Sequence, residues 1–236
     1  MGTTSPSAEL WRVETHSHTH YSRDCVTHFK QLVKVCRAKS IDKIVITDHD
    51  TAEGALAFAK LEPDLIIPGE EIMTTEGEIL AFFVQETIPP KLTPPETIKR
   101  LRDQGAFISV SHPFDRHRKG AWEKAWLDQI IGLVDAIEVF NARCLHMEDN
   151  AKSADYAAQH NILGTVGSDA HIPYELGKAN LLMPPFEGAS SFAESLRTAQ
   201  QKVQLSPAWV HGFSTLAKWQ RKYLMRPQPL THGNQL

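Results

Sequence analysis

The residues best suited to chemistry are histidines and carboxylates that directly follow short apolar runs. His16 and His18 stand one residue apart at the end of a predicted strand over 11–16, so both side chains project from one face of that strand. Two imidazoles side by side can chelate one divalent cation. Asp169 and His171 repeat this spacing after another apolar run. The pattern therefore predicts ligands for a metal ion.

The same residue types follow other predicted strands. Further candidates are His49 after 43–47, Glu71 after 64–67 and His112 after 106–110. Each one alone is equally typical of a capping or hydrogen-bonding residue at a strand end, and paired histidines occur on surface strands by chance. Their repetition favours a shared site, because buried imidazoles and carboxylates need partners or metals that offset desolvation. This mixture of ligands suits Mn, Fe or Zn.

A shared site requires strands whose ends meet. Apolar runs alternate with helical stretches, and the predicted strands cover 11–16, 43–47, 64–67, 79–84, 106–110, 135–140, 162–166 and 180–183. Repeated β-α units indicate a parallel sheet, and roughly six or seven of them in this length suit a closed or nearly closed barrel. An open doubly wound sheet is the alternative. In a barrel, the carboxyl ends of the strands carry the chemistry.

Helices are expected between these strands, beginning near residues 28, 53, 94, 122, 147 and 189. Thr27 is the expected cap of the first helix, whose buried face is predicted from the spacing of Phe29, Leu32, Val33 and Cys36. The helix from Ala189 is expected to extend to Gln201.

The composition is that of an ordinary globular protein, with 42% hydrophobic and 22% charged residues in a chain of 236. A net charge of -3 gives no strong signal for nucleic-acid binding. No apolar run approaches the roughly 20 residues that span a bilayer, and residues 1–9 lack the order of a signal peptide. Cys25, Cys36 and Cys144 show no CxxC spacing, so a disulfide framework is not expected. We expect a cytoplasmic protein without membrane contact.

The segment 207–236 differs from the rest of the chain. Its rough apolar stripe consists of Trp209, Val210, Phe213, Leu216, Ala217, Tyr223 and Leu224. Its positive charges are Lys218, Arg221, Lys222 and Arg226. We expect one domain over 1–236, in which 207–236 is a C-terminal helical tail packed on the barrel. A helix for a membrane surface or a partner is the alternative.

Several motifs occur in order between about residues 11 and 182. They are His16-Ser17-His18-Thr19 with Tyr21-Ser22 and Asp24, Thr47-Asp48-His49-Asp50-Thr51, Pro68-Gly69-Glu70-Glu71-Ile72, Ser111-His112-Pro113, Ala136-Ile137-Glu138-Val139-Phe140-Asn141 and Gly167-Ser168-Asp169-Ala170-His171. Together they resemble the PHP (polymerase and histidinol phosphatase) superfamily, in its small free-standing metal-dependent phosphoesterase type. The resemblance implies a distorted (β/α)7 TIM-like barrel that holds two or three divalent metal ions (Mn, Zn or Fe) at its carboxyl face.

The resemblance also implies a ligand set. By it, His16, His18, Glu71 and Asp169 surround one metal, Glu71 bridges to a second metal that His112 also binds, and Asp24, His49 and His171 hold a third. Some positions depart from the family pattern. Asp24 lies one residue later than the acidic ligand of many small members, and Asn141, a possible ligand, stands where some members have histidine. Glu78 stands where many have histidine, and Glu14, in place of the usual Asp, is expected to orient an imidazole.

These residues suggest a reaction. Two divalent ions can lower the pKa of a shared water, bind the non-bridging oxygens of a phosphate and offset the charge that builds up during displacement. Glu71 has one oxygen for each ion. We therefore expect a metal-activated hydroxide to hydrolyse a phosphoester without a covalent enzyme intermediate, with Glu71, Asp169 and His171 as catalytic residues.

Arginines near two strand ends are candidates for binding the substrate. Arg116 and Arg118 follow His112, and Arg143 follows Asn141. Guanidinium groups match phosphate oxygens in pairs, so any of the three could hold the phosphate or a second anionic group. The alternative for each is a solvated loop residue.

Three functions from different classes follow. The first is a phosphatase or phosphodiesterase acting on a small phosphorylated metabolite or a nucleotide. The second is a metal-dependent hydrolase of a non-phosphate, amide-type bond, and the third is a non-catalytic metal-binding regulatory module. The substrate, the metal and the oligomeric state are left open by the sequence.

Overall fold

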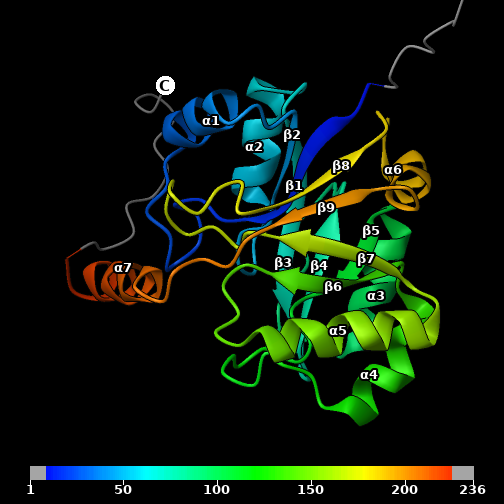
Figure 1. Ribbon diagram of the computed structural model, residues 1–236. Coiled ribbons are helices and arrows are strands. Elements are labelled where there is room, and N and C mark those ends of the chain that lie inside the picture. The colour runs from blue at the N-terminus through cyan, green and yellow to red at the C-terminus, as the bar shows by residue number, and fades with distance from the viewer. Residues whose placement is uncertain (1–8, 225–236) are drawn as a thin grey trace, which may run out of the picture.

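The computed structural model of the protein describes residues 9–224, whose strands form one sheet that nearly closes into a barrel (Figure 1). The strands are β1 (Trp11–Ser17), β2 (Lys43–Ile46), β3 (Ile66–Met73), β4 (Glu78–Phe82), β5 (Phe107–Val110), β6 (Ala136–Asn141), β7 (Leu163–Gly167), β8 (Ala179–Met183) and β9 (Gln200–Val203). The helices are α1 (Phe29–Ala38), α2 (Glu53–Leu61), α3 (Pro94–Asp103), α4 (Lys124–Ile130), the 3-10 helix η1 (Ile131–Leu133), α5 (Met147–His160), α6 (Ala189–Leu196) and α7 (Val210–Leu224).

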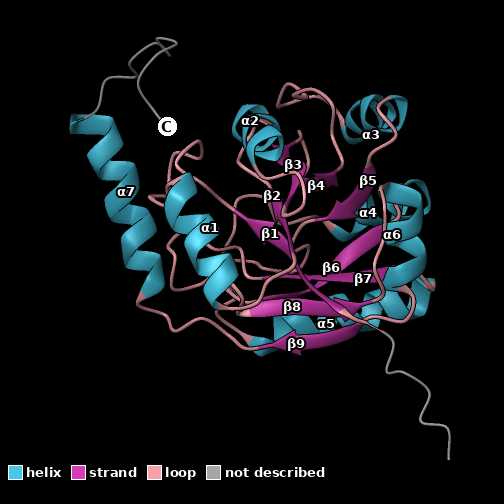
Figure 2. Cartoon of the chain, turned by 90° about the horizontal axis from the view of Figure 1, so that it is seen from above, coloured by secondary structure: helices cyan, strands magenta, loops and turns pink. Residues whose placement is uncertain are grey.

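The sheet runs in the order β7-β6-β5-β4-β3-β2-β1-β8-β9. Strand β1 is bordered by β2 on one side and, at its start, by β8 on the other. At its end, the segment that follows β7 takes the place of β8: the N–H of Asp169 donates to the carbonyl of His16 at 2.8 Å, and Ser17 and Ala170 form a parallel bridge. The predicted barrel-like α/β fold is confirmed, and Figure 2 shows its helices set around the strands.

The sheet is mixed, whereas the alternation of elements predicted a parallel one. Parallel pairing holds for β1 with β2, β2 with β3, β5 with β6 and β6 with β7. Strand β4 pairs antiparallel with both β3 and β5, and β8 pairs antiparallel with β1 and β9. The connection between β3 and β4 is a tight turn in which Thr74 Oγ1 donates to the carbonyl of Gly77 at 2.7 Å. So short a connection joins antiparallel strands only, because a parallel crossover needs a dozen or more residues.

Strand β3 is longer than its sequence suggests. Pro68 and Gly69 are typical turn residues, so the predicted strand ends at Ile67, yet β3 continues to Met73. Gly69 serves close packing here, because a Cβ atom at this position would lie 2.7 Å from both the carbonyl oxygen of Ala81 and Cγ1 of Val45. The strand is thereby extended to Glu71, which lies opposite Leu80 of β4.

Two helix ends and one strand differ from the predictions. Helix α1 is capped by His28 and Gln31 rather than by Thr27. Helix α6 ends at Leu196, and the residues expected to continue it form β9, which the sequence did not predict because all of its residues are exposed and carry no alternation. The buried face expected for α1 is present, since Leu32, Val33 and Cys36 are buried.

The C-terminal segment forms α7, which lies at the end of the sheet toward which β6 and β7 point (Figure 1). Val210 and Ala217 are buried, while Trp209, Phe213 and Leu216 are about half exposed. The part of the expected tail after Leu224, including Arg226, lies outside the described residues. Between residues 9 and 224, no helix combines the length and the apolar character that crossing a membrane requires.

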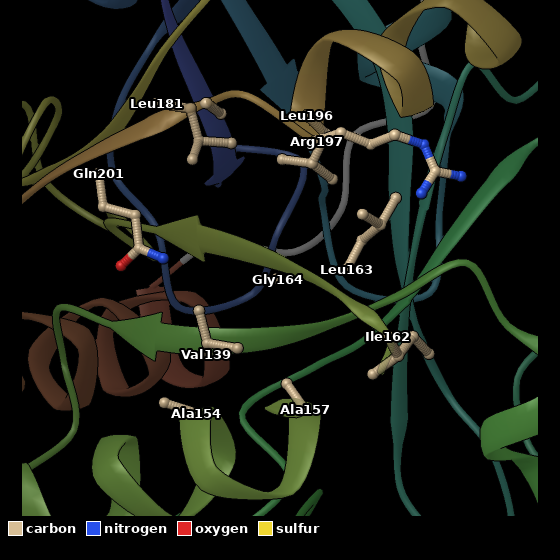
Figure 3. Close-up of a pocket in the computed structure, with 11 residues that line it drawn as sticks. Val139, Ala154, Ala157, Ile162, Leu163, Gly164, Leu181, Leu196, Arg197 and Gln201 are labelled. Carbon is tan, nitrogen blue, oxygen red and sulfur yellow. The ribbon is translucent and has the colours of Figure 1, made fainter. Parts of the chain in front are cut away.

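The larger core cluster is formed by strand residues together with buried residues of α3 to α6, and a smaller cluster under α1 and α2 contains Leu32, Ile44 and Phe58. A cavity of about 300 Å³ lies between α5, α6 and the strands β7, β8 and β9 (Figure 3). Its lining includes Ala154, Leu163 and Leu181 and contains none of the predicted metal ligands. The candidate site therefore lies elsewhere, at the carboxyl ends of the strands.

The close approach at Gly69 makes a stability prediction. Gly69→Ala should lower the free energy of unfolding by roughly 1–3 kcal/mol, because the added methyl group must displace the backbone of β4 or the side chain of Val45. Urea denaturation measures this difference. Gly132→Ala is the matched control, since a Cβ atom there meets nothing within 4 Å. Equal stability of the two variants would contradict the packing argument.

Candidate metal centre

The predicted ligands of the first metal converge at the carboxyl end of β1. His16, His18, Glu71 and Asp169 are all fully buried. Nε2 of His18 lies 3.3 Å from Oε2 of Glu71 and 3.2 Å from Oδ1 of Asp169. Nε2 of His16 lies 3.3 Å and 3.6 Å from the same two oxygens. Side chains from β1, β3 and the loop after β7 thus point their ligand atoms at one small volume.

Glu71 lies at the centre of the cluster and turns its two oxygens to different neighbours. Oε2 faces His16 and His18, and it also lies 3.1 Å from Nδ1 of His49. Oε1 lies 3.2 Å from Nε2 of His112 and accepts a hydrogen bond from Ser111 Oγ at 2.6 Å. The neighbouring Glu70 instead accepts the N–H of Ile88. Glu71 therefore has the placement that a bridging carboxylate requires.

The remaining predicted ligands lie beside this centre. The carboxylate of Asp24 reaches both His171, at 3.3 Å from Nε2, and His49, at 3.5 Å from Nε2. The ring of His18 lies between them, with its centroid 4.5 Å from that of His49 and 4.3 Å from that of His171. Asp169 adopts a left-handed backbone conformation with φ of 52°. Such a conformation is sterically costly for most residues but tolerated by Asp.

The donor set fits divalent metal ions. Three overlapping groups have ligand atoms within 4.8 Å of one another, namely His18-His49-His171, His16-His18-Glu71 and His49-Glu71-Glu78. Oδ1 of Asp169 and Nε2 of His112 are buried and have no hydrogen bond of good geometry. Buried carboxylate and imidazole atoms that converge without hydrogen bonds are suited to a cation, and N and O donors suit Mn, Zn or Fe.

Hydrogen bonds on the far side of the rings fix which nitrogen faces the cluster. Nδ1 of His16 lies 2.9 Å from Oε1 of Glu138, and Nδ1 of His171 lies 2.8 Å from the carbonyl oxygen of Asp169. Both oxygens only accept, so each Nδ1 carries a proton and Nε2 is the ring nitrogen that is left to bind a cation. Nδ1 of His18 lies 3.0 Å from Ser22 Oγ, whose own proton is donated to Asp48.

This network corrects the expectation for Glu14. Its carboxylate accepts the backbone N–H groups of Ser168 at 2.9 Å and Gly177 at 3.1 Å, and it contacts no imidazole ring. Glu138 orients the ring of His16 instead, and it also accepts the N–H of His112 at 2.9 Å. Glu14 does not orient a ring because its oxygens accept backbone N–H groups of the loops instead.

The charges in the cluster depend on one another. Burial would raise the pKa of Glu71, but the neighbouring His16 and His49 outweigh it and hold that pKa well below its ordinary value. Burial lowers the pKa of His49, yet Glu71 and Asp24 reverse the direction and raise that pKa to about 10. The pKa of His171 is lowered to about 3 by burial and by the charge of Arg143. Protonated imidazoles thus offset the carboxylates, and a divalent cation can replace those protons.

The three candidate arginines have different surroundings. Arg118 is about one-fifth exposed, and its guanidinium donates to Asp169 and lies 3.4 Å from Asp115. Arg116 is 61% exposed and pairs with Asp149 at 3.1 Å. Arg143 is buried, with Nε 3.1 Å from Glu175. Among the side chains of these three arginines, that of Arg118 alone contacts a predicted metal ligand, Asp169.

Asn141 presents a donor rather than an acceptor to the cluster. Its Oδ1 accepts the N–H of Arg143 at 2.9 Å, which turns Nδ2 toward Glu138 at 3.1 Å and Asp169 at 3.3 Å. In this orientation the amide supports two carboxylates. The oxygen that a metal would need faces the loop instead.

Two carboxylates in the cluster were not among the predicted ligands or orienting groups. Glu78 is buried with Oε2 3.4 Å from Nε2 of His112 and Oε1 3.7 Å from Nδ1 of His49. Glu138 lies behind His16. Both stand at strand positions, and a charged residue inside an otherwise apolar strand is a signal that could have identified them.

Comparisons with known families agree with this geometry. The family model described as "PHP domain" matches residues 14–68, and that described as "PHP-associated" matches residues 147–200. An uncharacterized protein of Methanocaldococcus jannaschii is 36% identical over 171 residues, which cover 71% of this chain and 68% of the relative.

Solved structures share the fold. A two-domain protein from Bacteroides vulgatus, which contains a predicted PHP-like metal-dependent phosphoesterase, is similar with a TM-score of 0.64 and 19% identity over 84% of this chain and 66% of its own. A lesion-specific endonuclease from Pyrococcus furiosus is similar with a TM-score of 0.61 and 15% identity, over 82% of this chain and 57% of its own. At these identities the likeness establishes the fold alone.

Removing the charge behind His16 should weaken metal binding. Glu138→Gln replaces a carboxylate that accepts from three groups by an amide with one acceptor oxygen, so the ring of His16 and the backbone of His112 lose their support. We expect about 10- to 100-fold weaker Mn²⁺ or Zn²⁺ binding, measured by titration calorimetry. Glu187→Gln, in an exposed loop, is the control. Unchanged affinity in Glu138→Gln would mean that this carboxylate does not support the ligands.

Metal binding should also release protons. The pKa of His16 and of His49 is raised because burial is outweighed by the surrounding carboxylates, so both rings are protonated near neutral pH and must lose that proton to bind a cation. The apparent affinity for Mn²⁺ should therefore rise by about tenfold or more per pH unit between about pH 6 and about pH 8. Calorimetry in buffers of different ionisation enthalpy counts the protons. An affinity independent of pH over this range would refute the assignment.

Proposed function

The chain belongs to the PHP (polymerase and histidinol phosphatase) family, and from this premise we propose that it is a metal-dependent phosphoesterase. Its proposed substrate is a small phosphorylated metabolite or a nucleotide. The proposed catalytic residues are Glu71, Asp169 and His171. The family assignment rests on the matched domains and on the relative from Methanocaldococcus jannaschii.

The observation that carries the proposal is the placement of Glu71. One oxygen faces His16 and His18 and the other faces His112, so a single carboxylate is shared by two sets of imidazoles. Ligand sets that share a carboxylate are the arrangement expected for a site with two neighbouring cations, which suits phosphoester hydrolysis because both the attacking and the leaving oxygen need stabilisation.

We propose that divalent ions are held by His16, His18, Asp24, His49, Glu71, His112, Asp169 and His171, with Glu78 as an additional ligand. Such ions would polarise the phosphoryl oxygens and lower the pKa of a water molecule. The residues of the chain contribute orientation. Ser22, Glu138 and the carbonyl of Asp169 hold the rings with Nε2 toward the centre, so the ligands do not need to rearrange on binding.

Arg118 is the proposed phosphate-binding residue. It is partly exposed, and its guanidinium lies against Asp169 at the edge of the ligand cluster. Burial would lower the pKa of Arg118, but Asp169 and Glu71 outweigh this effect and raise that pKa above its ordinary value, so this side chain stays charged. A charged guanidinium beside bound cations could donate hydrogen bonds to two phosphate oxygens, which would leave a third oxygen facing the metal ligands.

The experiment that tests the proposal is a substrate panel on metal-loaded protein. The panel contains phosphomonoesters and phosphodiesters, including nucleotides and a single-stranded oligonucleotide, together with amides. We expect release of phosphate or cleavage of a diester that is lost, by about 1000-fold or more, in Glu71→Gln. Hydrolysis of amides alone would replace the proposal by an amidohydrolase, and metal binding without any turnover would favour a regulatory module.

Two arginines in one loop allow a matched comparison. Arg118→Ala should raise KM for the phosphoester and lower kcat/KM by about 10- to 1000-fold, because a charge-assisted pair of hydrogen bonds to phosphate is lost. Arg116→Ala, two residues earlier and 61% exposed, should change kcat/KM by less than about twofold. Steady-state kinetics on metal-loaded protein gives both values. Equal effects of the two substitutions would remove Arg118 from the substrate site.

A further inference from the structure

A buried ion pair connects the loop after β7 with the loop after β6. Oε1 of Glu175 lies 3.1 Å from Nε of Arg143, and the two side chains are 0% and 4% exposed. Both charges are removed from water, so each depends on the other for compensation, and removing one partner leaves the other charge buried and unpaired. Neither residue belongs to the proposed metal ligands. The remaining polar atoms of the two side chains show what the pair supports.

The second carboxylate oxygen of Glu175 holds the backbone at a proposed metal ligand. Oε2 accepts the N–H of His171 at 2.9 Å and the N–H of Ile172 at 3.1 Å. The N–H of Glu175 itself donates to the carbonyl of Ile172 at 3.1 Å, which closes a tight turn. Glu175 thus fixes the main chain from which the imidazole of His171 projects.

The ring and the carbonyl of His171 are fixed by other groups. Nδ1 of the ring lies 2.8 Å from the carbonyl oxygen of Asp169. The carbonyl oxygen of His171 accepts the N–H of Val26 at 3.3 Å and lies 3.1 Å from Sγ of Cys25. His171 is therefore supported at its ring, at its carbonyl and at its N–H, and Glu175 supplies the third of these supports.

Arg143 connects this support to helix α7. Nη2 of Arg143 donates to Oγ of Ser214 at 2.8 Å, while Nε faces Glu175. The guanidinium thus uses one edge for the carboxylate and another nitrogen for the helix. Ser214 is buried on the side of α7 that packs on the rest of the protein. A continuous series of polar contacts therefore runs from the N–H of His171 to the C-terminal helix.

We propose that Glu175 is a positioning residue for the metal ligand His171 and that Arg143 extends this support to α7, so that the affinity for a cation depends on the packing of the C-terminal helix. The inference rests on the ligand role that the proposed function gives to His171. Glu175 and Arg143 act through the backbone of His171 and touch neither the cation nor the substrate. This role replaces the substrate-binding role that the position of Arg143 in the sequence suggested.

The test measures Co²⁺ binding to the full chain, by titration calorimetry and by visible absorption at saturating Co²⁺. Glu175→Ala removes both acceptor oxygens, and Glu175→Gln keeps one of them. Ser214→Ala removes one hydroxyl and leaves the ion pair in place. Glu194→Gln is the control for the carboxylate, which is 72% exposed at that position. Thr215→Ala is the control for the hydroxyl, because Thr215 is exposed and its Oγ1 donates to a carbonyl of the same helix.

The affinities should fall in a fixed order. Glu175→Ala should weaken Co²⁺ binding by about 10- to 100-fold, and Glu175→Gln should retain part of the affinity. Ser214→Ala should weaken it by about 3- to 10-fold, because the guanidinium loses one of its two anchors. The absorption spectrum, which depends on the number and geometry of the ligands, should change in Glu175→Ala and match wild type in both controls. A merely structural role would lower the free energy of unfolding and leave this spectrum unchanged.

The outcomes separate this inference from the proposed function. If both Glu175 variants fold and bind Co²⁺ with the affinity and spectrum of wild type, the positioning role is wrong, whatever the protein hydrolyses. Equal affinities of Ser214→Ala and Thr215→Ala would overturn the extension to α7. If wild type binds Co²⁺ but hydrolyses no phosphoester, the function fails, and the affinities still decide the role of Glu175. If Glu175→Ala does not fold, Glu175→Gln against Glu194→Gln gives the same decision.

Discussion

The constraint on which the structure depends is the burial of several carboxylates around Glu71. Isolated carboxylates cannot remain charged inside a protein without an opposite charge within a few ångströms. Here the imidazoles of His16, His49 and His112 and the guanidinium of Arg118 supply that opposite charge. The mixed sheet brings these groups together, because the carboxyl ends of β1 and β5 and the extended β3 meet at one point. Asp48, Glu138 and Glu14 then hold the loops in place.

How far the sequence predicts this site depends on how local each signal is. The period-two spacing of His16 and His18 is a property of one strand, and the structure places both side chains in the cluster. The role of Glu78 is not local, because it arises from antiparallel pairing of β4 with β5, which brings that residue to His112. Strand β9 was missed because exposed edge residues carry no hydrophobic period. The barrel-like fold was predictable from the alternation of elements, whereas strand direction around β4 was not.

The three candidate arginines show most clearly what the sequence alone does not predict. Their residue type and their distance from a predicted strand end are alike, yet one is solvent-exposed, one lies at the cluster and one is buried against Glu175. What separates them is the set of acidic partners brought near by the fold, namely Asp149, Asp169 and Glu175. Those partners lie far from each arginine in the chain. No pattern within the loop itself carries that information.

The closure of the sheet at β1 has a consequence for folding kinetics. The hydrogen bonds that join β1 to the segment after β7, from Asp169 to His16 and from His18 to Ala170, involve the metal ligands themselves. A further bond across the same seam, from Ser168 to Glu14, spans 154 residues of sequence. Contacts between such distant segments form late, because the entropy of closing so long a loop must be overcome first. A cation bound by these ligands would stabilise the contact between β1 and the segment after β7, which forms last. Dissociation of the cation and opening of the sheet at this place would therefore be coupled.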